Sequence, residues 1–412
     1  MDYFDAYPSE YYHTLKSNHN HYVLKIELLS YYENVIGEIE KELSISAQGQ
    51  ININYQQLTR RSCTLTLINV DNAYLPNPDG VVWINRKFKL WVGLRTSQDT
   101  FWFSQGVFII QNATSDGHTV TIEAVDKGGI LNGTIKLGMT ETEYKIEAGS
   151  NIAQIIKDSL MLTFGGHDGG ESSGCTPLDP VPPLIDFNYT NTQTQSEITL
   201  NSNDYIGDLF QQLAEGYGAD VYYDTNGRLR FETLVDGERT DGYRYLPLIW
   251  SYGDITADYA QSNVEYQFDG INTVTVYTNA SGIENVSYTA YNNNPLSPLR
   301  CDAVGIKRLE NQEITYVNVS KSEMLQRCKD YARYLLFKQS FVGMNVSFNS
   351  IIIPHLDVNC AIGITDSLKG FENEKFIIQS ITIPLSAGEM NVTATNVNWL
   401  PLDVDVEGGR GR

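Results

Sequence analysis

The sequence predicts a mainly β protein with an α/β insertion (α+β), in which one β-unit occurs twice. The first observation is that the four residues Phe-Ile-Ile-Gln occur at 108–111 and again at 376–379. The second is that short runs of alternating apolar and polar residues, separated by loops rich in Pro, Asn and Gly, fill both ends of the chain. The third is that the middle instead carries two amphipathic helical patterns and a hairpin.

Each copy of Phe-Ile-Ile-Gln lies in the same longer pattern: a strand with a late Gly, a loop, a strand, a loop and a strand. The flanking strands are 90–94 and 119–124 for the first copy, and 360–364 and 390–394 for the second. We therefore expect two cassettes, about 60–130 and 342–396, that share one strand order and superpose. Their equivalent positions, with alternate residues inward, should be Phe108, Ile110, Phe376 and Ile378.

The first predicted domain, 1–135, is a polar arm followed by strands. Residues 63–68 alternate cleanly, and a long loop rich in Pro and Asn follows them. So many short strands in one segment are typical of a barrel or sandwich. The expected strands are 22–29, 43–55, 63–68, 81–94, 101–111 and 118–125.

The second predicted domain, 136–255, is the α/β insertion. Ser150 or Asn151 can cap a helix at 151–162, and a second helix at about 203–215 ends at Gly216. The predicted buried faces are Ile152, Ile155, Ile156 and Leu160 in the first helix, and Ile206, Leu209, Phe210 and Leu213 in the second. Residues 165–183 form an exposed loop, and 221–231 form a hairpin with a tight turn at Asn226-Gly227.

The third predicted domain, 256–404, returns to strands and ends with the second cassette. Clear strands lie at 272–277 and 286–289, and the tail 405–412 is polar and mobile. One long helix at about 321–338 starts at a capping box formed by Ser320 and Glu323. Its predicted apolar face is Met324, Cys328, Tyr331 and Leu335.

Composition limits the possible partners. At 412 residues the chain is too long for one core, and its formal charge of -21 disfavours binding to nucleic-acid phosphates. An acidic protein can still line a passage through which DNA slides, or be acidic only for solubility. Five widely spaced cysteines without a CxxC pair indicate reduced thiols in a protein made in a cytosol. We expect no signal peptide in the acidic N-terminus and no membrane insertion, because no apolar run approaches roughly 20 residues.

No catalytic, cofactor-binding or metal-binding residue is assigned, because no motif for such chemistry occurs. HExxH, Walker, GxSxG and GxGxxG patterns are missing from the sequence. His19 and His21 could reach one metal ion but lie in a polar arm, where solvated histidines are expected. His167 to Glu171 lies in the predicted loop, and Asp224 to Glu232 has the wrong spacing for a calcium loop.

Hydrolase chemistry is not indicated either. A cysteine nucleophile needs a partnering histidine, and a pair such as Cys175 and His355 is far apart in the sequence. Paired carboxylates are uninformative in a chain with 50 Asp and Glu residues. We therefore expect a protein that is not an enzyme and that uses no cofactor.

Taken in order, the strands resemble the baseplate hub, or tail-tip, family of bacteriophages and phage-tail-like particles. The resemblance covers nearly the whole chain and lies in order and spacing, not in one diagnostic motif. The opening strand and turn are 22–29 and 34–37; the next matching stretches are 61–71, 83–87, 93–94, 106–110, 120–126 and Leu131. The closing stretches are 356–358, 363–364, 376–378, 384–385 and 390–394, and the helix and hairpin at 203–231 also match.

The resemblance implies two tail-tube-like β-barrel domains per chain, related by internal duplication, and a homotrimer. Three chains would then form a channel ring that adapts the six-fold tail tube to the three-fold spike or tail tip. The implied partners are the tail tube or distal tail protein, the spike or tail-tip protein and the tape-measure protein, with DNA passing through without specific binding. The implied location is the virion tail, after assembly in the host bacterial cytoplasm. No fused lysozyme or peptidase domain is recognisable, in contrast to some members of the family.

Two other functions remain open at this stage. Tyr-rich β-structure and acidity also suit a host-surface (carbohydrate) binding tail module, although such a module would not need an internal duplication. A tail-associated cell-wall hydrolase is the third possibility. It would require a convergent set of catalytic groups that the sequence does not reveal.

Overall fold

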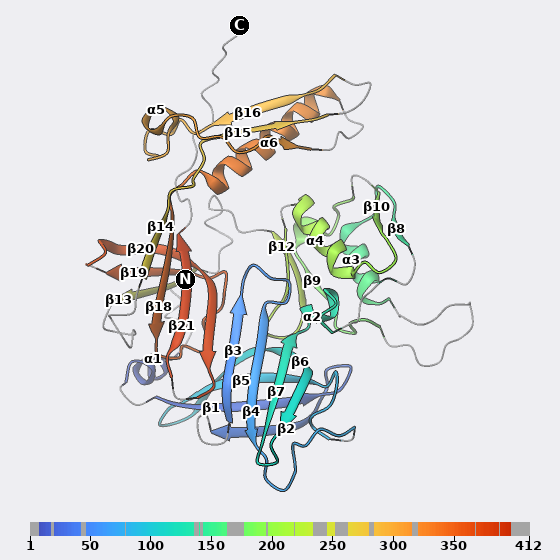
Figure 1. The fold of residues 1–412 in the computed structure, drawn as a ribbon, viewed down its shortest axis with the longest axis vertical. Helices are drawn as coiled ribbons and strands as arrows, with labels where there is room; N and C mark the ends of the chain where they lie inside the picture. Colours follow the sequence, from blue (N-terminus) through green and yellow to red (C-terminus); the bar gives the residue numbers. More distant parts are fainter. Residues whose placement is uncertain are drawn as a thin grey trace.

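The computed structural model describes residues 8–396 except for 18–19, 43–46, 79, 136–139, 141–142, 163–176, 195–196, 218, 234–244, 252–262, 280–283, 315–319, 367 and 387. The predicted tail 405–412 and most of the predicted loop 165–183 lie outside the described residues. Three hydrophobic clusters organise the described chain. Figure 1 shows them as a strand-rich lower and left part, an α/β part on the right and a separate body at the top.

A 13-stranded sheet carries most of the strands. Its order is β14-β18-β21-β20-β3-β4-β7-β6-β5-β1-β2, with β19 beside β20 and β13 beside β19. Its members are β1 (His21–Leu29), β2 (Val35–Glu42), β3 (Ala47–Asn54), β4 (Arg61–Ile68), β5 (Lys87–Arg95), β6 (Thr100–Ser115), β7 (Thr119–Asp126), β13 (Tyr245–Ser251), β14 (Asn263–Gln267), β18 (Gly343–Ser350), β19 (Ala361–Asp366), β20 (Phe371–Pro384) and β21 (Met390–Asn396). The strand β2 was not predicted from the sequence.

The two cassettes have the same strand pairing. In the first, β4 pairs with β7, β7 with β6, and β6 with β5; in the second, β18 pairs with β21, β21 with β20, and β20 with β19. The β6–β7 pairing is irregular between Ile110 and Asn112, and the β20–β21 pairing is irregular between Ile378 and Ser380. Each Phe-Ile-Ile-Gln motif therefore ends in a glutamine at a β-bulge.

A matched backbone detail precedes β5 and β19, the strands that pair with the first halves of β6 and β20. Asn85 and Asn359 both have φ of 58°, a left-handed conformation that asparagine tolerates better than most residues. The N–H of Asn85 donates to the carbonyl oxygen of Ile110, and the N–H of Asn359 donates to that of Ile378. The four motif positions Phe108, Ile110, Phe376 and Ile378 are buried in the common core, whereas Ile109 and Ile377 between them are also buried but lie outside that core.

The expected closed barrels do not form among the described strands. Instead, the second half of β20 pairs with β3, the strand that precedes the first cassette and pairs with its β4, from Ser380 opposite Asn54 to Pro384 opposite Gln50. The reason lies in the bulge, because beyond Gln379 the long strand leaves β19 and exposes a fresh hydrogen-bonding edge. Both cassettes consequently belong to one open sheet, and their buried side chains form one common core.

The insertion forms the second hydrophobic cluster. Its elements are α2 (Gly128–Leu131), β8 (Tyr144–Ile146), α3 (Ile152–Leu160), β9 (Leu184–Ile185), η2 (Phe187–Tyr189), β10 (Ile198–Leu200), α4 (Ile206–Tyr217), β11 (Ala219–Tyr223) and β12 (Leu229–Thr233). Asn151 caps α3 by accepting the N–H of Gln154, and both predicted helix faces are buried. Gly216 lies inside α4 instead of ending it. The turn between β11 and β12 spans 224–228 and is longer than predicted.

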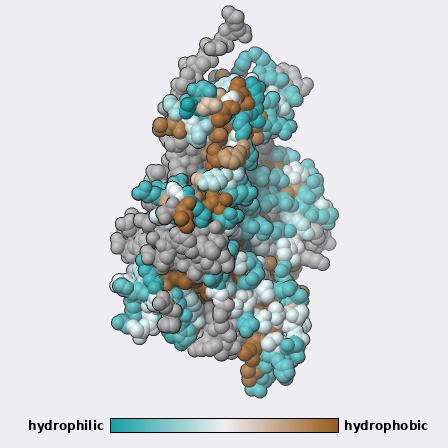
Figure 2. Space-filling view, turned by 60° about the vertical axis from the view of Figure 1, so that its left-hand side comes forward, coloured by the Kyte–Doolittle hydropathy of each residue, from teal (hydrophilic) through white to brown (hydrophobic). Residues whose placement is uncertain are grey.

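The third cluster is a body of its own, in which β15 (Thr273–Tyr277), β16 (Ser287–Tyr291) and β17 (Gln312–Glu313) form a sheet covered by α6 (Lys321–Gln339), with α5 (Cys301–Val304) beside it. Ser320 caps α6 by accepting the N–H of Glu323. The predicted apolar face was partly wrong: Met324 and Cys328 are buried, but Ala332 and Leu336 follow them at a step of four. Figure 2 shows hydrophobic surface on this upper body, whose exposed apolar side chains include Tyr291, Leu296, Val304, Ile306, Leu325 and Tyr331.

The short N-terminal helix α1 (Ser9–Leu15) packs against the sheet. Tyr11 is fully buried, and its hydroxyl lies 2.5 Å from Nδ1 of His355, in the loop between β18 and β19. Burial lowers the pKa of His355 to about 3, so this imidazole stays neutral at physiological pH. The contact ties the N-terminal helix to the second cassette.

Candidate functional site: a buried ionic junction

The described residues do not assemble the sites that the sequence left open. His21 starts β1 and is exposed, whereas His19, His167, Glu171 and Cys175 lie outside the described residues. Within the described chain, no group of three or more His, Cys, Asp and Glu side chains could hold a metal ion. Similarly, none of the described helices is long and apolar enough to span a bilayer.

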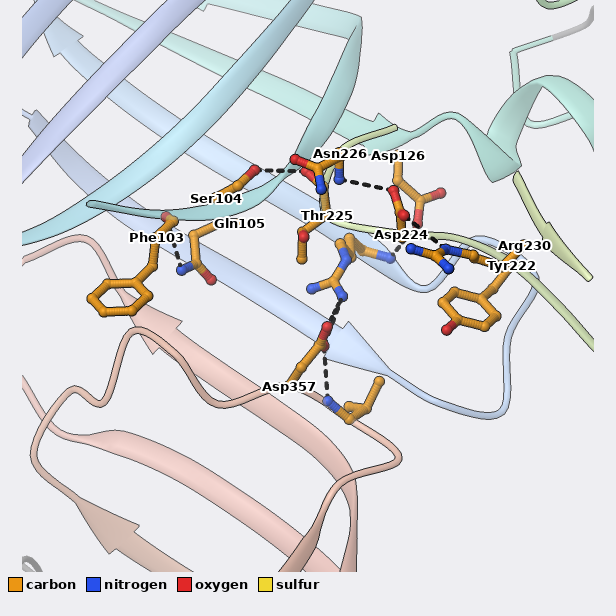
Figure 3. Close-up of polar contacts among 12 residues, drawn as sticks. Phe103, Ser104, Gln105, Asp126, Tyr222, Asp224, Thr225, Asn226, Arg230 and Asp357 are labelled. Carbon is orange, nitrogen blue, oxygen red and sulfur yellow. Dashed lines mark hydrogen bonds and ion pairs between the residues drawn. The ribbon is translucent and has the colours of Figure 1, made fainter. Parts of the chain in front are cut away.

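The most unusual chemistry is a set of buried and half-buried charged side chains where the two cassettes and the insertion meet; Figure 3 shows the part of it around Asp126 and Asp357. We call this set the ionic junction. Its acidic members are Glu33, Asp126, Asp179, Asp220 and Asp357, and its basic members are Arg60, Arg61, Lys87 and Lys127. Charged side chains are almost never fully buried unless they are paired, so the partners of each one show what holds this region together.

Arg61, the first residue of β4, joins the two cassettes. Its side chain is 2% exposed, and Nη2 donates to both carboxylate oxygens of Asp357 at 2.6 Å. Figure 3 shows Asp357 reaching toward the first cassette from the loop before β19. Burial acts to lower the pKa of Arg61, but the charge and hydrogen bond of Asp357, together with the nearby Asp126 and Tyr222, outweigh it, and the net shift is upward. The guanidinium therefore stays charged and holds the two cassettes together.

Asp126 closes β7 and organises the strand ends. Its carboxylate is 1% exposed and accepts two backbone N–H groups, from Arg61 and from Gly128, each at 2.9 Å. A Cβ at Gly128 would lie 2.4 Å from the carbonyl oxygen of Leu58, so only glycine fits there. Burial raises the pKa of Asp126 to about 7 despite these hydrogen bonds.

Lys127 connects the first cassette to the insertion. Its fully buried ammonium lies 2.5 Å from Glu33 and 2.9 Å from Asp179, and it donates to the carbonyl oxygen of Gly227 at 2.8 Å. Glu33 also accepts Lys87 at 3.0 Å, so two ammonium groups face two carboxylates. Burial, with Lys127 as the next cause, lowers the pKa of Lys87. The ammonium of Lys127 has three N–H donors, and it has three acceptors around it: Glu33, Asp179 and the carbonyl oxygen of Gly227.

The hairpin tip at 224–228 docks on β5 and β6. Ser104 donates to the carbonyl oxygen of Thr225 at 2.6 Å, and Lys89 donates to Asn226 at 2.8 Å. Figure 3 shows Asp224, Thr225 and Asn226 grouped beside Ser104. Asp224 accepts the N–H groups of Asn226 and Arg228, which explains why the turn is longer than an Asn-Gly pair requires.

Arg60 makes a second link between the first cassette and the insertion. It donates to both oxygens of Asp220 at 2.6 and 2.7 Å, and its guanidinium lies 3.8 Å from the ring centre of Tyr222. The contacts of the ionic junction are therefore paired and geometrically specific. Each guanidinium is paired through Nη2, while the buried Nε atoms of Arg60 and Arg61 have no hydrogen-bond partner. Because the charged groups face one another across separate parts of the fold, the junction has the arrangement of a structural lock.

Sequence reasoning missed this junction because its members are far apart in the chain. The only local signal was two charged pairs at strand ends, Arg60-Arg61 and Asp126-Lys127, each beside apolar strand residues. Charged residues in that setting are usually solvated, so the signal alone does not predict burial.

The fold itself has relatives among solved structures. The 43 kDa tail protein of prophage MuSo2 from Shewanella oneidensis matches 92% of this chain and 98% of its own, with 12% identity and a TM-score of 0.53. The tail protein of Neisseria meningitidis MC58 matches 91% of this chain and 96% of its own, with 11% identity and a TM-score of 0.54. The chain has a phage tail-protein fold. The likeness to tail proteins indicated by the sequence is thereby confirmed at the level of the fold.

A further structural relative is a chain of a protein complex from Francisella. In the lidded form of the Francisella PdpA–VgrG complex, one chain matches 92% of this protein, and the match covers 52% of that chain. The identity is 10% and the TM-score is 0.53. No protein-family model matches the chain, and no curated protein does.

Proposed function

We propose that this tail-protein fold is a baseplate hub: a trimeric channel ring that adapts a six-fold tail tube to a three-fold spike or tail tip. The observation that carries the proposal is the repetition within the large sheet. Strands β14-β18-β21-β20 and β3-β4-β7-β6 follow one another as two four-stranded blocks, with matched bulges in β20 and β6. Two similar blocks per chain make three copies the smallest ring with six similar units.

The repetition supports an internal duplication in which each cassette is one tube-like unit. On this proposal the first unit, with the N-terminal arm, occupies 1–135, the insertion 136–255, the second unit with the body around α6 256–404, and the tail 405–412. The body of β15, β16 and α6 has its own core, so it is an excursion within the second unit. The long bulged strands supply the curvature that a ring wall needs.

The ionic junction suits this role because a hub must transmit load without coming apart. Lys127, Arg60 and Arg61 each bridge separate parts of the fold through charge-assisted hydrogen bonds. Breaking such a buried pair leaves an uncompensated charge, so the parts are coupled strongly. We infer that the cassettes and the insertion move as one body.

The proposed partners follow from the position of a hub. They are two further copies of this chain, the tail tube or distal tail protein, the spike or tail-tip protein and the tape-measure protein. The proposed location is the virion tail, with assembly in the host bacterial cytoplasm. DNA would pass through the ring without specific binding, because a formal charge of -21 per chain repels phosphates.

Copy number is the direct test. Native mass measurement of the full chain, alone and with its neighbours from the same particle, should give three copies. A stable monomer under both conditions, or a ring of six copies, would exclude this form of the hub. Zymography on host cell walls and a glycan-binding assay should both be negative, since positive results would favour the hydrolase or the carbohydrate-binding module.

A further inference from the structure

Lys127, Asp179 and Glu33 form a compact triad inside the ionic junction. The Nζ atom of Lys127 lies 2.9 Å from Oδ1 of Asp179 and 2.5 Å from Oε1 of Glu33. The side chains of Lys127 and Asp179 are fully buried, and that of Glu33 is 10% exposed. An amine, a carboxyl group and a second carboxylate held together in a buried site are the groups that formation of an intramolecular amide bond requires.

Each member of the triad comes from a different part of the chain. Lys127 follows β7, Asp179 lies between α3 and β9, and Glu33 lies in the turn between β1 and β2. The N–H of Asp179 donates to the carbonyl oxygen of Leu160 at 2.9 Å, which fixes this residue at the end of α3. Glu33 has φ of 62°, which is uncommon for a residue other than glycine, and its N–H donates to the carbonyl oxygen of Ser30 at 2.9 Å. The fold therefore holds the three side chains together from three sides.

The carboxyl group of Asp179 is activated by two donors. Its Oδ2 accepts the hydroxyl of Tyr223 at 2.8 Å, and its Oδ1 accepts the N–H of Val181 at 3.0 Å. Burial, followed by the charge of Asp179, raises the pKa of Tyr223 well above its usual value, so this hydroxyl keeps its proton and donates. Donors on the carboxyl oxygens stabilise the negative charge that develops there when a nucleophile adds to Cγ.

The nitrogen of Lys127 is placed to add to that carbon. Because Oδ1 of Asp179 is bonded to Cγ, Nζ lies within about 4 Å of Cγ, close to the roughly 3–3.5 Å of a near-attack arrangement. Moving one proton from the ammonium to the carboxylate converts a buried ion pair into a neutral amine and a neutral acid, and burial favours neutral groups. The ammonium of Lys87 lies 3.0 Å from the same oxygen of Glu33, so the loss of one proton also relieves the repulsion between two cations.

We propose that Lys127 and Asp179 form an intramolecular isopeptide bond after the chain has folded, with Glu33 as the group that relays a proton. The ion pair between Lys127 and Asp179 is the reactant state. The bond joins the end of β7 covalently to the insertion and closes a loop over residues 127–179. This inference concerns a single chain, so it is independent of the proposed hub and of its copy number.

The reaction balances without an added reagent. The Nζ atom of Lys127 adds to Cγ of Asp179 to form the new N–C bond, the Cγ–Oδ1 bond breaks, and Oδ1 leaves as water. Of the three ammonium hydrogens, one stays on the amide nitrogen and two leave in the water. The first of these two passes directly to Asp179, and the second passes by way of Glu33, which ends as the carboxylate that it was at the start. Nothing is oxidised or reduced.

The two arginine pairs of the ionic junction lack this combination of groups. Arg60 with Asp220 and Arg61 with Asp357 use guanidinium groups, which keep their protons and are not nucleophiles. Lys127 differs because its amine lies between two carboxylates, one that can react and one that can move a proton. The geometry of the triad therefore favours a covalent bond in addition to an ion pair.

The mass of the denatured full chain is the direct test. Formation of the bond releases water, so the parent should be lighter than its sequence by about 18 Da. Digestion and tandem mass spectrometry should give a branched peptide in which Lys127 is joined to Asp179. A succinimide at an Asp-Gly pair removes the same mass, but Asp179 precedes Pro180, whose nitrogen carries no hydrogen and cannot form that ring.

Four variants assign the roles of the triad. Lys127→Arg and Asp179→Ala should both have the full mass of their sequences. Glu33→Gln keeps the shape and a hydrogen-bond acceptor but cannot relay a proton, so it should fold and yet form the bond on the order of 10²-fold more slowly. Lys25→Arg is the matched control, because Lys25 is a partly buried lysine that pairs with Glu27 at 3.2 Å away from the triad. It should lose water as the parent does.

The outcomes decide the proposal at two levels. A folded parent of full mass, with separate peptides for Lys127 and Asp179 after prolonged incubation, would overturn the bond. A linked parent whose Glu33→Gln variant links at the same rate would overturn the role of Glu33. The mass and the peptides of the parent decide the first question even if a variant fails to fold. Because the mass is that of the denatured single chain, its result stands whatever copy number the native measurement gives.

Discussion

At the scale of single residues, the ionic junction is held together by buried charged side chains that contact groups of opposite charge. Lys127 is the clearest case, because its ammonium is fully buried between Glu33 and Asp179 and saturated with acceptors. A buried ion pair adds little net stability compared with apolar residues, but removing one member is costly. The junction is therefore better understood as fixing one arrangement of the cassettes and the insertion than as a large source of stability.

Replacing Lys127 tests that view. Lys127→Met should leave Glu33 and Asp179 without their shared cation and destabilise the protein by about 3–5 kcal/mol. Lys145→Met is the matched control, because Lys145 pairs with Glu143 while both side chains are 55% exposed, and such pairs contribute little. Thermal denaturation of the two variants should show a large loss for Lys127→Met and almost none for Lys145→Met. Equal, small effects would mean that the ammonium is not buried in solution.

The pH dependence of stability follows from Asp126. Its pKa is raised to about 7 by burial, compared with about 3.9 in an unfolded chain. The protonated carboxyl is favoured in the folded state, so this contribution is fully present below about pH 4 and is lost as the pH rises through 7. Between pH 4 and 8 the loss is on the order of 4 kcal/mol.

Asp126→Asn isolates that contribution. The amide cannot ionise, but it accepts only one of the two N–H groups, from Arg61 or Gly128, and should be less stable than the parent at pH 5. Its melting temperature relative to the parent should improve steadily from pH 5 to pH 8. A difference that does not change with pH would show that Asp126 is ionised throughout.

At the scale of elements, sequence patterns predicted the features that depend on nearby residues, such as helix positions and helix caps. The helices α3, α4 and α6 were found from apolar spacing and caps, and Asn151 and Ser320 do cap as expected. The turn at 224–228 and the face of α6 were only partly right. In both cases a local preference was overruled, by the hydrogen bonds of Asp224 in the turn and by the close packing of Ala332 in the helix.

The faces of α3 and α4 yield a direct test. Leu209 and Phe210 are fully buried in α4, so Leu209→Asp or Phe210→Asp would place an unpaired charge in the core and should unfold the insertion. Gln211→Asp, on the exposed side of the same helix, is the control and should melt like the parent. Circular dichroism during heating gives the comparison. An unchanged melting temperature for Leu209→Asp would refute the assigned face.

Asn85 and Asn359 test whether the two cassettes use the same backbone device. Both adopt φ of 58°, so a β-branched residue at either position would be strained. Asn85→Val and Asn359→Val should each lower stability by about 1–2 kcal/mol, whereas Asn85→Gly and Asn359→Gly should be nearly neutral. Denaturant titration of the four variants measures this. A cost confined to one site would argue against equivalent roles.

At the scale of the whole molecule, the sequence could indicate repetition but not how the copies join. The Phe-Ile-Ile-Gln echo marks both bulged strands, and the alternation marks their inward residues. The pairing of β20 with β3 links residues more than 300 positions apart, and the contact of Arg61 with Asp357 is similarly remote. Such long-range pairings depend on how the whole core packs, so no local sequence pattern predicts them.

Charge is the remaining property that belongs to the whole assembly. In the proposed ring of three copies, each chain would bring an excess of 50 acidic over 29 basic residues to the wall around one channel. If the lumen carries a clear share of it, DNA phosphates are repelled and the genome passes without being trapped. An experimental structure of the assembled ring should show a surface potential more negative inside than outside. The ring should also fail to retain double-stranded DNA at low salt, where attraction to a basic wall would be strongest. A neutral or basic lumen would assign the acidity to solubility and remove the electrostatic part of the hub proposal.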